Sequence, residues 1–176
     1  MDERTDFETR FTIEPGERTI VIERLFDAPR QLVFEAATRA EHLARWWGPR
    51  GSEVVECRTD PRPGGAWRLV LRMPDGSLHG FGGVYREVAP PARFVQTFRY
   101  DGFPDAEAVE TATLEERDGR TLLTVTVLHE SVENRDGQVA SGMEPGARES
   151  HERLAELLAE LRRARTGAGS RAGGVR

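Results

Sequence analysis

A histidine occupies an apolar position in the most regular helical pattern of this sequence. In GARESHERLAELLAEL, residues 146–161, apolar residues recur at steps of three and four, and His151 stands on this stripe one turn before Leu154. Imidazole titrates near neutral pH and can act as a general acid or base. Two interpretations follow: a hydrogen bond satisfies the ring inside a core, or the helix borders a partly open cavity that His151 faces. The stripe consists of Ala147, Leu154, Leu157, Leu158 and Leu161.

Two further histidines alternate with apolar residues in strand-like segments. His79 shares a face with Phe81 and Tyr85, and His129 shares one with Val125 and Val127. Together with His151 they could border one cavity, and three histidines would suit zinc. They lie on separate elements without local ligand spacing, so we expect no metal, and we expect each ring to be hydrogen-bonded or at a cavity mouth. The fourth, His42, is expected at the surface.

No established catalytic motif is present, and the catalytic residues stay open. The sequence lacks GxSxG, HExxH, paired CxxC, P-loop and GxGxxG patterns. GFGG, residues 80–83, lies inside a strand pattern and is expected to permit sharp bending or close approach of the helix. Cys57 is expected to be a small core residue, and Glu110 to lie on the solvent face of its strand.

Composition limits the classes of partner. The 176 residues carry a net charge of −5, and the 25 basic residues, all arginine, are spread along the chain, so we expect no nucleic acid partner. No apolar run reaches the ~20 residues that span a bilayer, which predicts no membrane insertion. A charged start without a signal-peptide pattern and a single cysteine indicate a cytoplasmic protein without a disulfide. No cofactor is expected.

Hydrophobic periodicity predicts an α+β fold. RTIVIERLF predicts a strand, Pro29 opens a short helix, and a second short helix is predicted to be capped by Thr38 and Glu41 and to stop at Gly48. Six alternating segments then predict strands separated by turns such as PDGS and RDGR. The long helix is predicted to begin near Ser141 or Pro145 and to stop at Gly167. The result is a curved antiparallel sheet of about seven strands around a C-terminal helix.

One folded domain is expected, flanked by two tails. Residues 1–16 are a polar tail with a short strand possible at FETRFTI, residues 17–165 form the domain, and the Gly-rich residues 166–176 are expected to be disordered.

Four segments carry a resemblance to a known family. FDAPRQLVFEAATRAEHLARWWGP, DPRPGGAWR, GFGGVYREVAPPARFVQTF and GMEPGARESHERLAELLAEL, in this order, resemble the SRPBCC superfamily of START-like helix-grip proteins. The similar branch is that of the activator of the heat-shock-protein-90 ATPase. The resemblance implies a hydrophobic ligand cavity between sheet and helix. Where this branch usually has Trp and Leu, the chain has Ala147 and His151, which predicts a roomier and more polar pocket.

Three hypotheses of function follow. The first is binding of a hydrophobic or aromatic small molecule in that cavity. The second is an enzyme of cyclase or hydrolase type in the same cavity, with His151 or His129 as acid–base. The third is a co-chaperone-like interaction module; a homodimer is also possible in principle. The predicted ligand-binding residues are Trp46, Trp67, Phe81, Tyr85, Phe98, His129, His151 and Leu154.

Overall fold

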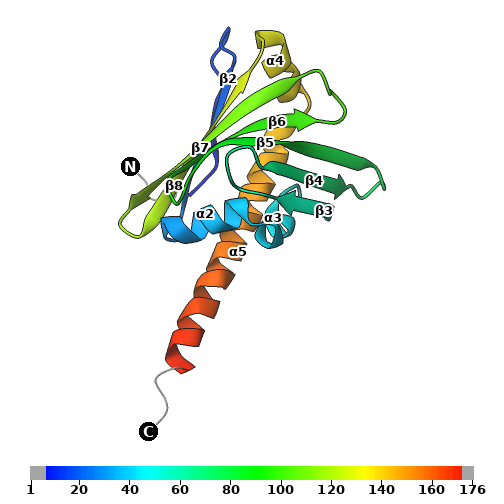
Figure 1. Cartoon of the computed structure of the whole chain (residues 1–176). Coiled ribbons are helices and arrows are strands. Elements are labelled where there is room, and N and C mark those ends of the chain that lie inside the picture. Colours follow the sequence, from blue (N-terminus) through cyan, green and yellow to red (C-terminus); the bar gives the residue numbers. More distant parts are fainter. Residues whose placement is uncertain (1–6, 172–176) are drawn as a thin grey trace.

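The protein forms one antiparallel sheet that curves around a long helix (Figure 1). A computed structural model describes residues 7–171. The sheet has eight strands in the order β1-β2-β8-β7-β6-β5-β4-β3, and all neighbours are antiparallel. The strands are β1 (Arg10–Thr12), β2 (Thr19–Phe26), β3 (Glu53–Thr59), β4 (Ala66–Arg72), β5 (Leu78–Ala89), β6 (Arg93–Tyr100), β7 (Glu107–Arg117) and β8 (Arg120–His129).

The helices lie on one face of this sheet. They are α2 (Arg30–Thr38), α3 (Ala40–Trp46), α4 (Val132–Ala140) and α5 (Met143–Arg171). Figure 1 shows α5 crossing the sheet with α2 and α3 beside it, and its C-terminal part extending past the sheet. The predicted α+β helix-grip architecture is therefore confirmed, with eight strands instead of about seven.

The core follows the two periodicities of the sequence. Leu154, Leu157 and Leu158 of α5 are buried, as the helical stripe predicts. Alternate residues of β4, Trp67, Leu69 and Leu71, are buried beneath it, whereas the intervening residues are more exposed. One face of the sheet is thus apolar and covered, which is the arrangement that the alternation predicts.

The glycines of β5 allow a close approach, although to a strand and not to the helix. A Cβ atom on Gly83 would lie 1.9 Å from the backbone oxygen of Thr97 in β6. A register shift between Tyr85 and Glu87 in the same strand adds a bulge, and bulges bend a strand. The GFGG segment therefore serves the curvature of the sheet that surrounds α5.

Several predicted boundaries were wrong. Thr38 does not cap α3; it ends α2, and its hydroxyl donates to the Phe34 carbonyl. Ser141 is the C-cap of α4, a helix that the sequence analysis missed because it has few apolar residues. Helix α5 begins at Met143 and continues through Gly167 to Arg171, since a helix tolerates single glycines at a modest cost.

The predicted tails lie partly outside the described residues. Residues 1–6 and 172–176 belong to them. Within the predicted N-terminal tail, β1 pairs with β2, with Phe11 opposite Ile22. The short strand considered for this segment is therefore present.

Candidate functional site

Aromatic side chains fill the centre of the predicted cavity. Trp67 donates its indole N–H to the Thr97 carbonyl at 3.0 Å and stacks on Phe98, with 6.0 Å between ring centroids. Phe81 packs against Phe98 at 5.8 Å and against Trp47 at 4.7 Å. The remaining hollow, lined in part by Trp67, Tyr85 and Trp47, has a volume of about 30 Å³. This volume is about that of one water molecule in the liquid.

Of the two adjacent tryptophans, the structure places the unpredicted one at this hollow. Trp46 is buried in the core, and its indole N–H donates to the Ala36 carbonyl at 2.9 Å. Trp47 is half-buried and lines the hollow. Successive helical residues point about 100° apart, so the sequence required one inward and one outer ring but could not assign them.

His129 is held by hydrogen bonds to Arg18 and to helix α4. Its Nδ1 is 3.2 Å from the Arg18 carbonyl oxygen, and its Nε2 is hydrogen-bonded to the side-chain amide of Gln138 in α4. Helix α4 thus covers the His129 ring, which is buried. His79 is held separately, 2.7 Å from the Tyr100 hydroxyl. The three histidines do not converge, and residues 7–171 contain no group of three metal-ligating side chains.

His151 is enclosed and does not face an open cavity, which corrects the expectation. It is 7% exposed, and its Nδ1 lies 3.2 Å from the Thr9 hydroxyl, with which it shares a hydrogen bond. The ring meets Phe26 edge-on at 5.7 Å. Burial, and then the positive charge of Arg24, lower the pKa of His151 to about 4. The ring is therefore neutral at pH 7.

The polar pair on the α5 stripe is thus explained by hydrogen bonds. Next to His151, the Ser150 hydroxyl accepts a hydrogen bond from the Gly48 N–H at 2.9 Å. This backbone N–H, which follows the end of α3, therefore has a partner. His151 and Thr9 do meet the geometric condition of the enzyme hypothesis, a perturbed histidine beside a second polar group. Both are buried, however, and neither lines either of the two hollows described in this section.

An inward-facing carboxyl group was missed. Glu110 of β7 stands between the buried Ala108 and Ala112, on the covered face of the sheet. Gln96 donates to its Oε2 at 2.8 Å, and burial raises the pKa of Glu110. The signal was available, because Glu110 shares its parity with apolar neighbours at 108, 112 and 114.

Two other groups at the centre are held in their neutral forms. Burial raises the pKa of the Tyr85 phenol, and the nearby acidic groups of Cys57 and Glu110 raise it further. Burial also raises the pKa of the Cys57 thiol. A thiol without an electropositive neighbourhood is a poor nucleophile, which supports a packing role for Cys57.

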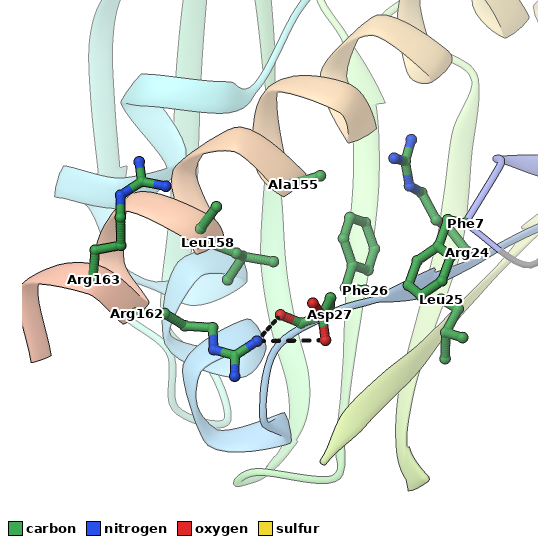
Figure 2. A pocket seen from close by; sticks show the side chains of 10 residues that line it. Phe7, Arg24, Leu25, Phe26, Asp27, Ala155, Leu158, Arg162 and Arg163 are labelled. Atoms are coloured by element: carbon green, nitrogen blue, oxygen red, sulfur yellow. Dashed lines mark hydrogen bonds and ion pairs between the residues drawn. The ribbon is translucent and has the colours of Figure 1, made fainter. Parts of the chain in front are cut away.

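The larger pocket lies between the end of β2 and α5 (Figure 2), and its volume is about 300 Å³. Residues 24–27 form one wall and include Phe26. The other wall is a stripe of α5 residues that lies beside the stripe of buried leucines. Phe7 also lines the pocket. This stripe consists of Ala155, Leu158, Ala159, Arg162 and Arg163.

Charged groups surround the apolar floor of this pocket. Arg162 donates to the Asp27 carbonyl at 2.6 Å and lies 3.4 Å from the Asp27 carboxylate (Figure 2). The guanidinium of Arg24 lies over the Phe26 ring, 5.3 Å from its centroid. Burial lowers the pKa of Arg24, against the opposing charges of Glu152 and Glu8. The pocket therefore combines apolar and cationic surfaces.

None of the eight predicted ligand-binding residues lines this pocket. Two of them lie next to it: Leu154 precedes Ala155 on α5, and His151 contacts Phe26 from behind the wall. The helix stripe at 155, 158 and 159 could have indicated the pocket, but the partner wall from β2 could not be foreseen.

The fold and the space between sheet and C-terminal helix define a helix-grip domain of the SRPBCC type. The sequence from residue 27 to 159 matches the family model described as activator of Hsp90 ATPase homolog 1-like protein. The chain belongs to this family, which confirms the resemblance found from its motifs. Among curated proteins, none matches the sequence significantly.

Solved structures share the whole fold. A protein from Rhodobacter sphaeroides is 29% identical, with a TM-score of 0.80 over 87% of this chain and 99% of that one. A protein from Chromobacterium violaceum is 28% identical, with a TM-score of 0.71 over 80% and 96%. A family member from Silicibacter pomeroyi is 25% identical, with a TM-score of 0.67 over 81% and 99%. In the described part of this chain, no helix is long and apolar enough to cross a membrane.

Proposed function

We propose that the protein binds a small apolar or aromatic molecule between its sheet and α5, in the pocket at the end of β2. The observation that carries the proposal is the hollow of about 300 Å³ over Phe26, Leu158 and Ala155. Ligand pockets of about 300–1,000 Å³ with mostly apolar linings and a few polar groups are typical of small-molecule sites. The centre of the sheet, at about 30 Å³, has room for no such molecule in this conformation.

The size and shape of this pocket favour a compact ligand. Phe26 offers a ring face and Leu158 an aliphatic surface, whereas Ala155 and Ala159 leave space that larger side chains would fill. An aromatic body of two or three rings would bury apolar area against both walls, and each Å² contributes about 25 cal/mol.

The test uses N-phenyl-1-naphthylamine, an uncharged probe whose fluorescence rises in apolar surroundings. We expect saturable binding of one probe per chain. Ala159→Phe, which places a ring in the pocket, should weaken binding at least tenfold. The matched control is Ala164→Phe, an exposed position on the same helix outside the pocket lining. Equal affinity of both variants and the unaltered chain would place the probe elsewhere and refute the proposed site.

A further inference from the structure

Arg24 is the unusual charged group of the β2–α5 pocket. It makes no hydrogen bond or ion pair with any residue from 7 to 171, and its Nε is enclosed without an acceptor. Its guanidinium lies over the face of Phe26, 5.3 Å from the ring centroid. A half-buried guanidinium with five donors normally has a carboxylate, phosphate or carbonyl partner.

The neighbouring acids do not supply this partner. Glu152 and Glu8 act on Arg24 through their charge alone, without a hydrogen bond. Asp27, the acid that lines the pocket, is engaged by Arg162 through both its carbonyl and its carboxylate. Among residues 7–171, the cation at the apolar floor of this pocket therefore has no hydrogen-bond acceptor.

The residues that line the pocket carry a net positive charge. Three arginines and one aspartate line the pocket, and the pair of Arg162 and Asp27 leaves Arg24 and Arg163 in excess. In Figure 2, Arg24 and Arg163 lie on opposite sides of Phe26 and Leu158. An apolar body between the walls would therefore have a cation at either end.

We infer that the ligand is an amphipathic anion, with one carboxylate-like group held by Arg24 and an apolar or aromatic body over Phe26 and Leu158. This inference rests on the proposed function of the pocket and adds the chemical class of its ligand. A carboxylate can accept two parallel N–H bonds from a guanidinium, and such charge-assisted bonds are stronger than neutral ones. The partly dry floor strengthens them further.

The test compares two molecules of one shape, 2-naphthoate and its uncharged amide, 2-naphthamide, as competitors of N-phenyl-1-naphthylamine. Hydrogen bonds to charged groups contribute roughly 1.5–3 kcal/mol, so we expect naphthoate to bind about tenfold to a hundredfold more tightly. Arg24→Gln should reduce the preference for the acid over the amide to twofold or less. The preference is a ratio of two affinities within one variant, so a change in the affinity of the neutral probe does not enter it. Arg24→Lys, which keeps the charge without the planar fork, should retain an intermediate preference.

Control variants separate this result from general attraction to arginine. Arg58→Gln, at an exposed position of β3 outside the pocket, should keep the full preference. Raising the salt concentration should reduce the preference in the unaltered chain, because mobile ions screen the pair. Loss of the preference in the Arg58 variant as well would overturn the inference.

The outcomes distinguish the inference from the proposed function. If the neutral probe does not bind, the proposed function fails. If it binds but the acid and the amide compete equally, the pocket stands and the anionic ligand is refuted. The chain itself offers carboxylates at Asp2, Glu3 and Asp6. A preference that is absent from the full chain and present after deletion of residues 1–6 would assign Arg24 to these groups and overturn the inference.

Discussion

Acid should destabilise this protein through His151 in a defined pH window. Burial and the charge of Arg24 lower the pKa of His151 from 6.5 to about 4. The unfolded chain, with the ordinary pKa, therefore takes up a proton at a higher pH than the folded chain. The resulting stability is complete above pH 6.5, is lost as the pH falls toward 4, and is constant below that. At about 1.36 kcal/mol for each pKa unit, the loss is about 3 kcal/mol.

Urea unfolding at several pH values between 7.5 and 4 measures this loss. The informative comparison is the double variant Thr9→Val with His151→Leu, because the single change at His151 would leave the buried Thr9 hydroxyl without its partner, at a cost of about 1–3 kcal/mol. The double variant should lack about 3 kcal/mol of the pH dependence between 6.5 and 4. Carboxyl groups also titrate in this range, but they are common to both chains and cancel in the difference.

Two results would contradict this reasoning. One is a double variant whose free energy of unfolding falls with acid as steeply as that of the unaltered chain. The other is an NMR titration of the His151 ring with a midpoint at or above pH 6. His42→Gln, a change on α3, is the control, and it should keep the steep acid dependence.

Three further changes test the packing of the fold by urea unfolding. Leu154→Ala, at a fully buried position of α5, should cost about 2–5 kcal/mol, and a loss below 1 kcal/mol would mean that α5 is not tightly packed. Gly83→Ala should destabilise strongly, because its Cβ would stand 1.9 Å from the Thr97 carbonyl oxygen; Gly137→Ala in α4, where nothing lies within 4 Å, should be neutral or stabilising, and equal effects would argue against the close approach. Glu110→Gln should stabilise the chain at pH 8 and less so at pH 4.5. The raised pKa of Glu110 favours its protonated form, so the stability that this form contributes is present at low pH and is lost as the pH rises through the folded pKa; no gain at pH 8 would contradict the buried carboxyl.

The local sequence pattern predicted most of the architecture. Alternation in β4 identified the covered face of the sheet, and the three- and four-residue steps of α5 identified the helix that covers it. These signals are reliable because strands and helices have different side-chain periods, and each period can be recognised from residues that are close together in the sequence. Helix α4 was not predicted, because its nine residues, VENRDGQVA, show little apolar periodicity. Ser131 caps this helix.

The candidate site was foreseen only in part. Its general place, between sheet and C-terminal helix, followed from the resemblance. None of the eight predicted residues lines the pocket, and Trp67 and Tyr85 line the small central hollow instead. The inward direction of Glu110 was readable from its parity, whereas the partner of His151 was not. Thr9 lies 142 positions away in the sequence, and no local period connects the two.

The sequence by itself determined most of the strands and helices, which faces are apolar, and the family to which the chain belongs. Only the tertiary structure decided where space remains. Side chains from β4, β5 and β6 interdigitate at the centre, while small residues of α5 meet the end of β2 and leave a hollow between them. The physical reason is that a cavity is the difference between the volume that distant elements enclose and the volume that their side chains fill, and both depend on how the elements are placed in space.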